Sequence, residues 1–144
     1  MRKQAVAMLV GTMTSAISMA APLYRAEIAV SASSLVAGVE LADFPVLVRI
    51  SESRIQGFSY ALCAPGGADI SFSSDESGNN RLPFEIDTWN PDGESLVWVK
   101  IPSLANGTKF YLAFSDTSPA ANTPASTWKA DYSGVWHMRE AAGT

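Results

Sequence analysis

Three short stretches between residues 84 and 114 alternate polar and apolar side chains, and this period of two limits the possible folds more than any other feature. The stretches are Phe84–Trp89, Ser95–Ile101 and Lys109–Phe114. A period of two is typical of a β-strand with one buried face, and no stretch beyond the N-terminal segment sustains a helical period. The sequence therefore predicts three strands here.

The connections between these strands predict how they pair. Asn90–Gly93 has the composition of a turn, and Asn106-Gly107 offers the positive φ values of a tight hairpin. Parallel strands need crossovers of about a dozen residues or more, which these connections do not provide. We therefore predict an antiparallel meander with one continuous apolar face. That face would consist of Phe84, Ile86, Val97, Val99, Ile101, Phe110, Leu112 and Phe114.

The apolar face of the meander decides the fold class, because it has to be buried against a second layer. Further strands are predicted at Arg25–Val30, Phe44–Ile50, Tyr60–Cys63 and Asp69–Ser73. Pro45 suits the start of a strand or an edge strand, since proline cannot donate to a ladder. We predict an all-β fold, an antiparallel β-sandwich of jelly-roll-like type, as one complete domain plus the first strand of a truncated second.

The first twenty residues predict export. Arg2 and Lys3 precede the uncharged stretch Ala5–Ile17, and Ser18–Ala20 supplies the small residues of a cleavage site. This is the pattern of a secretory signal peptide, and the stretch is too short and too weakly apolar for a transmembrane helix. We predict a signal peptide at 1–20, a secreted, periplasmic or cell-surface location and no membrane span beyond the signal peptide. An uncleaved N-terminal anchor is the alternative.

The charge balance excludes one class of partner. Ten Lys and Arg residues stand against 14 Asp and Glu residues, which gives a net charge of −4. The basic residues form no cluster, whereas a domain that binds a nucleic-acid duplex is expected to carry a basic patch. We therefore predict no nucleic-acid partner.

The chain changes character after the domain predicted at 21–116. Residues 117–127 are rich in Ser, Pro, Ala, Asn and Thr and predict a linker. The aromatic-rich residues that follow, within 128–144, predict either the start of a lectin-like domain or a segment that docks on the first domain. A lone strand rarely folds without partners, so we favour a fragment of a longer protein.

A series of ordered motifs resembles a known family. In chain order the motifs are Tyr24-Arg25, Phe44–Val48, Gly67–Phe72, Leu82–Trp89 and Val97–Pro102. Across residues 23–116 they resemble the bacterial exported family known as domain of unknown function 2341. That family typically ends its last strand in a Tyr-Gly-Asn motif, where this chain has Phe114-Ser115-Asp116. The resemblance implies a secreted or surface β module with no established catalytic residues.

A second resemblance lies further along the chain. Gly134–Met138 resembles the opening of the concanavalin-A-like, laminin-G-like modules that often follow this family. It implies a downstream lectin-like domain of the same protein as a partner. Glycan is a candidate ligand by inference from such lectin-like neighbours.

Glu85 and Asp87 are the candidates for catalysis. Their spacing is similar to that of the Glu-Ile-Asp-x-x-Glu strand in laminarinase-type glycoside hydrolases, but the last position is Asn90, which cannot act as an acid. A serine nucleophile fails as well, because Gly57–Ala61 ends in alanine where a nucleophile elbow has glycine. We therefore predict that the protein is not an enzyme and has no catalytic residues.

The residues also argue against a metal or cofactor site. One histidine and one cysteine exclude the usual His/Cys metal site. Asp75–Asn79 clusters oxygen ligands that could suit calcium, but the spacing fits no standard loop and favours a polar turn. Cys63 is interpreted as a buried, inert thiol. We predict no metal and no cofactor.

The outer side of the predicted meander is the candidate binding face. Alternation places Leu96, Lys100 and Lys109 on it, together with the five candidate ligand-binding residues Glu85, Asp87, Trp89, Trp98 and Tyr111. Aromatic rings stack on the apolar face of a sugar, and charged groups bond to its hydroxyls. The alternative is that Trp98 and Tyr111 are covered by another loop or by the next domain.

These observations predict a non-catalytic, secreted or cell-surface β-sandwich accessory module with carbohydrate as its candidate ligand. The first alternative is a structural spacer that orients a downstream lectin-like domain. The second is an incomplete glycoside hydrolase.

Overall fold

A computed structural model describes residues 23–31, 39–119, 121–128, 132, 134 and 135. The predicted signal peptide lies outside the described residues, as do residues 136–138 of the lectin-like motif. Within the described residues, no helix is long and apolar enough to cross a membrane.

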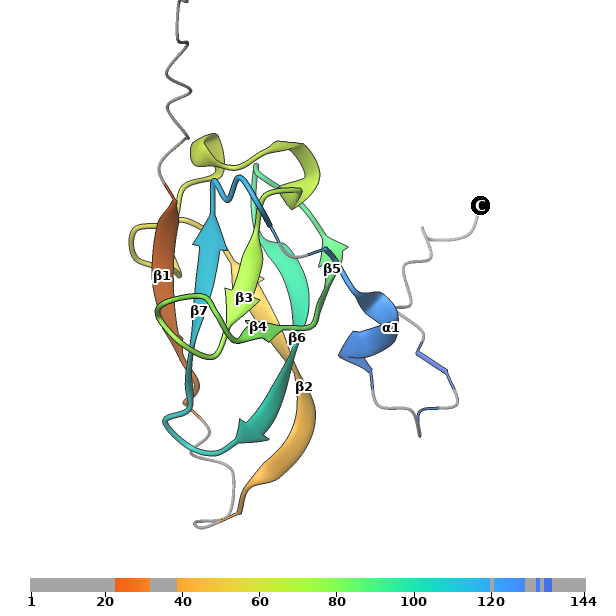
Figure 1. Ribbon diagram of the computed structural model, residues 1–144. Helices are drawn as coiled ribbons and strands as arrows, with labels where there is room; N and C mark the ends of the chain where they lie inside the picture. The colour runs from red at the N-terminus through yellow and green to blue at the C-terminus, as the bar shows by residue number, and fades with distance from the viewer. Residues whose placement is uncertain (1–22, 32–38, 120, 129–131, 133, 136–144) are drawn as a thin grey trace, which may run out of the picture.

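Among the residues that the structure describes, seven strands form two antiparallel sheets that pack face to face (Figure 1), which confirms the predicted β-sandwich. The four-stranded sheet has the order β1-β7-β3-β4, and the three-stranded sheet has the order β2-β6-β5. The strands are β1 (Tyr24–Ala29), β2 (Leu41–Ile50), β3 (Ser71–Ser73), β4 (Arg81–Leu82), β5 (Phe84–Thr88), β6 (Ser95–Leu104) and β7 (Lys109–Phe114). Three short helical turns complete the described elements: η1 (Tyr60–Leu62), η2 (Pro65–Gly67) and α1 (Pro124–Thr127).

The core lies between the inner faces of the two sheets. Phe110 and Phe114 of β7 and Phe72 of β3 approach it from one sheet, and Phe84 of β5 approaches from the other; all four are fully buried. The rings of Phe72 and Phe84 are 5.3 Å apart across the interface. The apolar positions of the alternating stretches are therefore the ones that hold the two layers together.

The predicted three-strand meander is wrong in one respect, because β7 belongs to the other sheet. β5 and β6 pair as predicted, but β7 pairs with β1 and β3. Asn106-Gly107 does form a tight turn, with φ +82° at Gly107, yet this turn carries the chain from one sheet to the other. The backbone of Val30 bonds to Gly107 and Thr108 there. Alternation shows which side chains are buried, but two apolar faces that meet look like one continuous face in a sequence.

The strand predicted at Tyr60–Cys63 is wrong, because Tyr60–Leu62 form the 3₁₀ turn η1 and Cys63 follows it. The Tyr60 hydroxyl donates to the carbonyl oxygen of Ile50 at 2.7 Å and lies 2.8 Å from the hydroxyl of Ser95, so the turn is tied to the ends of β2 and β6. Cys63 is half-buried, and burial followed by the charge of Asp69 raises its pKa to about 12. The Cys63 sulfur is therefore an unreactive thiol at neutral pH.

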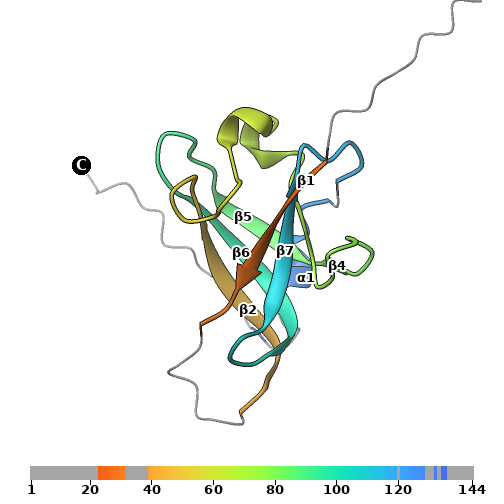
Figure 2. The ribbon, with the colours of Figure 1, turned by 90° about the vertical axis from the view of Figure 1, so that its left-hand side faces the viewer.

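The two long sides of the sandwich differ. On one side the chain passes directly from β4 to β5 through Pro83, which joins the two sheets. On the other side, which Figure 2 faces, β1 and β2 are the outermost strands of separate sheets. β2 begins at Leu41 and is an edge strand, so of the two predicted settings for Pro45 the edge strand is confirmed and the strand start is not.

Residues 75–80 form the predicted polar turn between β3 and β4. The Asp75 carboxylate accepts a hydrogen bond from the hydroxyl of Ser77. It also accepts hydrogen bonds from the backbone N–H groups of Asn79 at 3.3 Å and Asn80 at 2.8 Å. These bonds, led by the one from Ser77, hold the pKa of Asp75 below its ordinary value. The oxygen atoms of this carboxylate are thus used by the turn itself.

Candidate functional site

The outer face of the three-stranded sheet brings together part of the predicted binding face. In the strand register, Leu47 of β2 is opposite Trp98 of β6, and Trp98 is opposite Glu85 of β5. The neighbours of Trp98 along β6, Val97 and Val99, are fully buried in the core. Alternation therefore turns Trp98 outward, as the sequence predicted.

A tryptophan from beyond the sandwich packs on this face. The indole Nε1 of Trp128 donates to Oε2 of Glu85 at 2.6 Å, and the Trp128 ring lies 5.1 Å from the ring of Trp98. The exposed ring of Tyr132 lies 6.0 Å from that of Trp128. We call Glu85, Trp98, Trp128 and Tyr132 the tryptophan cluster. It combines one carboxylate with three aromatic rings on a single surface.

Hydrogen bonds to the backbone of β5 place Trp128 in the cluster. Thr123 N–H donates to the carbonyl oxygen of Phe84 at 2.8 Å, and the side-chain oxygen of Asn122 accepts the N–H of Ile86 at 3.3 Å. The chain then turns through α1, beside β5 in Figure 1, where Thr127 is completely buried. Residues 122–128 therefore pack along the edge of β5 that β6 does not use. We call residues 122–128 the docked segment.

Trp89 is not on this face, which corrects the predicted set. β5 carries a bulge at Asp87, because Ile86 is opposite Val97 whereas Thr88 is opposite Leu96. One extra residue reverses the alternation, so Trp89 turns inward and packs against the core. Its ring lies 5.3 Å from that of Tyr60. It also lies over Gly67, where an added Cβ would come within 2.7 Å of the indole.

Tyr111 is also separated from the cluster, because β7 belongs to the four-stranded sheet. Its hydroxyl donates to Oε2 of Glu27 at 3.3 Å, and the Lys109 ammonium lies 2.9 Å from Oε1 of the same carboxylate. The hydrogen bond and charge of Lys109 hold the pKa of Glu27 below its ordinary value. The single predicted face is thus divided between opposite sides of the sandwich.

Asp87 remains close to the cluster in sequence, but the bulge gives it a different setting. Asp87 is half-buried, and its carboxylate accepts a hydrogen bond from the hydroxyl of Thr88 at 3.3 Å. Asn90, the third position of the hydrolase-like spacing, lies in the following turn, where its side-chain oxygen accepts the N–H of Asp92 at 3.2 Å. In the described part of the chain, no group of three or more His, Cys, Asp or Glu residues is placed to hold a metal ion.

Comparison with known proteins adds one finding to this geometry. Residues 66–132 match the family described as Domain of unknown function (DUF2341). The DUF2341 match covers β3 to β7, α1 and every member of the tryptophan cluster. It begins after β1 and β2, so it leaves out the first two motifs of the predicted resemblance, and it extends past Asp116 through the docked segment. No curated protein and no solved structure matches the chain.

The sequence did not assign Trp128 to the site. It lies 30 residues after Trp98 and follows a stretch without apolar period, and only the concentration of aromatic residues after Thr127 distinguishes it. That signal supported docking on the first domain as one of two alternatives, without indicating the contact with Glu85. The resemblance of Gly134–Met138 to a lectin-like module stays a prediction.

Proposed function

We propose that this chain is a non-catalytic accessory module of an exported protein, and that its three-stranded sheet anchors the chain that leads to a downstream lectin-like domain. The observation that supports the proposal is the packing of Trp128 on Trp98 with its hydrogen bond to Glu85. Export is inferred from the N-terminal signal pattern, and the lectin-like domain from the resemblance of Gly134–Met138.

The anchor combines two kinds of contact with different roles. The hydrogen bonds of Asn122 and Thr123 to β5 fix the register of the docked segment. The ring contact of Trp128 contributes about 0.5–1.5 kcal/mol beyond its buried area, and a hydrogen bond to a charged group contributes about 1.5–3 kcal/mol when well buried. Trp128 and Glu85 are only half-buried, so lower values apply. Such an anchor limits the directions that the following chain can take.

Hydrogen exchange tests the anchor directly. In Trp128→Ala, we expect the amides of Thr123, Ser126 and Thr127 to exchange about tenfold faster, because the docked segment opens locally. The matched control is Tyr111→Phe on the opposite sheet, which should leave their exchange unchanged. Equal exchange of these amides in the parent protein and in Trp128→Ala would refute the anchor.

Carbohydrate binding is the second candidate function, and the composition of the tryptophan cluster favours it. Tyr132 is 47% exposed and its ring adjoins that of Trp128, which in turn contacts Trp98 and the Glu85 carboxylate. Aromatic rings and a carboxylate are the groups that sugar rings and hydroxyls need. A glycan array separates the two candidates. Binding that is lost in Trp98→Ala and Trp128→Ala, but kept in Lys109→Gln, supports a glycan site. Absence of binding by the parent protein rejects it.

A further inference from the structure

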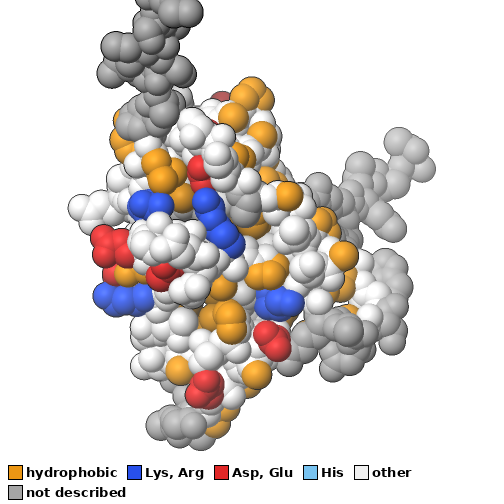
Figure 3. Space-filling model, in the orientation of Figure 1, with side chains coloured by type: hydrophobic (Ala, Val, Ile, Leu, Met, Phe, Trp, Pro, Cys, Tyr) orange, Lys and Arg blue, Asp and Glu red, His pale blue; other side chains and the backbone are white. Residues whose placement is uncertain are grey.

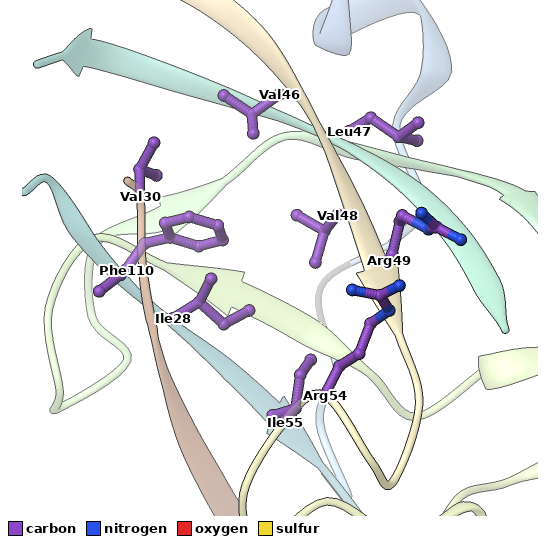
Figure 4. A pocket seen from close by; sticks show the side chains of 10 residues that line it. Ile28, Val30, Val46, Leu47, Val48, Arg49, Arg54, Ile55 and Phe110 are labelled. Carbon is purple, nitrogen blue, oxygen red and sulfur yellow. The ribbon is translucent and has the colours of Figure 1, made fainter. Parts of the chain in front are cut away.

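A groove opens between the two sheets on the side where β1 and β2 form the edges. Its volume is about 340 Å³, near the lower end of the usual range for ligand sites. Side chains from both inner faces line it. They are Ile28 and Val30 from β1 and its end, Phe110 from β7, Val46 and Val48 from β2, and Ile55 from the loop after β2. Figure 4 shows these side chains around a common space.

The groove exists because the sandwich is closed on only one side. On the opposite side the chain joins the sheets through Pro83, whereas β1 and β2 have no strand between them in the described part of the chain. Phe110 is 1% exposed, but Ile28, Val30 and Val46 are only half-buried, so the core reaches solvent here. An aliphatic occupant would remove this apolar surface from water, which is favourable.

One end of the groove carries positive charge. Arg49 and Arg54 lie together on the side of the groove away from Val30 in Figure 4. Both guanidinium groups bind the carboxylate of Glu94, one at each oxygen. Two cations share one anion, so these three side chains together carry a net charge of +1, and the described lining contains no Asp or Glu. An anion placed there would complete the pairing.

We propose that this groove binds a free aliphatic carboxylate, with its hydrocarbon chain over Ile28, Val46 and Val48 and its carboxylate at Arg54. Arg49 alternates with Val48 in β2, so it approaches Glu94 from the other side of this strand. The hydrocarbon chain and the carboxylate of the ligand each match a different part of the site. The apolar walls favour the chain, and the unbalanced arginine pair favours the anion. Leu47, at the rim of the groove, is opposite Trp98 in the register, but the walls assigned to the ligand belong to the inner faces of the sheets. The proposed site therefore does not depend on the proposed anchor.

Methyl NMR with octanoate tests the proposal on the unaltered protein. We expect saturable shifts at the methyl groups of Ile28, Val30, Val46, Val48 and Ile55. Acetate, which lacks the chain, should bind more than about tenfold more weakly. Octanol, which lacks the charge, should bind about fivefold more weakly. Groove methyls that do not respond to octanoate, or that respond equally to acetate, would overturn the proposal.

Substitution of one arginine tests the position of the carboxylate. Arg54→Gln should weaken octanoate binding about fivefold and leave octanol binding unchanged, because only the charged partner is lost. Lys109→Gln removes a cation from the outer face of the other sheet and is the matched control; its affinity for octanoate should equal that of the parent protein. Loss of octanol affinity in a folded Arg54→Gln would contradict the assigned orientation. Groove shifts produced by a blocked peptide of alternating apolar residues, but not by octanoate, would replace the proposal with strand addition.

Discussion

On the outer face of the three-stranded sheet Trp98 is packed against Trp128, whereas on the outer face of the four-stranded sheet Tyr111 bonds to the ion pair of Glu27 and Lys109. Both faces carry an outward aromatic ring beside a carboxylate. The carboxylate of one face receives an indole N–H from a residue 43 positions away, and that of the other receives a lysine from the neighbouring strand. Charged side chains of both signs lie over the four-stranded sheet in Figure 3.

This difference shows that the residues of a strand do not determine what covers its outer face. The backbone of β5 forms hydrogen bonds with the backbone of Thr123 and the side chain of Asn122, and this places Trp128 over Trp98. On the other sheet, the polar turn at residues 75–80 reaches Arg25, whose guanidinium donates to the Ser77 carbonyl oxygen at 2.9 Å. We therefore expect the two faces to respond differently to matched substitutions.

The largest difference is expected between alanine substitutions of the two outward rings. Trp98→Ala should lower the free energy of unfolding by about 2–3 kcal/mol, because a half-buried indole loses contacts with its cross-strand neighbours and Trp128. Tyr111→Ala should lower it by about 1 kcal/mol. Urea denaturation at neutral pH measures both values. Equal losses would remove the distinction between the faces.

A double-mutant cycle isolates the contact between the two tryptophans. Trp128→Ala alone should cost about 1–2 kcal/mol, and the coupling energy between Trp98 and Trp128 should be about 1 kcal/mol. The same cycle between Tyr111 and Trp128 is the control, since these residues lie on opposite sides of the sandwich. It should be additive within about 0.5 kcal/mol. Coupling of similar size in both cycles would point to a general loosening of the fold.

The sandwich itself could be predicted, because period-two alternation and short connections leave few other ways to bury the apolar positions. The binding face could be predicted only in part. Glu85 and Trp98 are cross-strand neighbours, so local alternation was sufficient for them. To place Trp89 correctly, one has to know that β5 has a bulge at Asp87. To place Tyr111 correctly, one has to know which sheet contains β7. Both depend on tertiary pairing that a strand pattern does not contain.

A smaller effect is expected at the Glu85 carboxylate. Glu85→Gln keeps an oxygen for the Trp128 indole but removes the charge, so the free energy of unfolding should fall by about 0.5–1 kcal/mol. The loss should become smaller when Trp128 is already alanine, because the indole donor is then absent. Thermal or urea denaturation of the four proteins provides the comparison. A loss of the same size with and without Trp128 would contradict the contribution of this hydrogen bond.

The smallest effect is expected at the exposed ion pair of the four-stranded sheet. The pKa of Glu27 is lowered by Lys109, so the pair stabilises the fold above the ordinary pKa of the carboxyl group, and this contribution is lost as pH falls through the lowered value. The difference in stability between the parent protein and Lys109→Gln should therefore shrink on acidification and in high salt. A difference that grows in acid would contradict this sign.

The central claim is that Trp128 is held on the sheet by Trp98 and Glu85, and nuclear Overhauser spectroscopy tests it most directly. We expect cross-peaks between the ring protons of Trp98 and Trp128, together with slow solvent exchange of the Trp128 indole N–H that becomes fast in Glu85→Ala. Absence of these cross-peaks, with an indole N–H that exchanges at the rate of a free tryptophan side chain, would contradict the account.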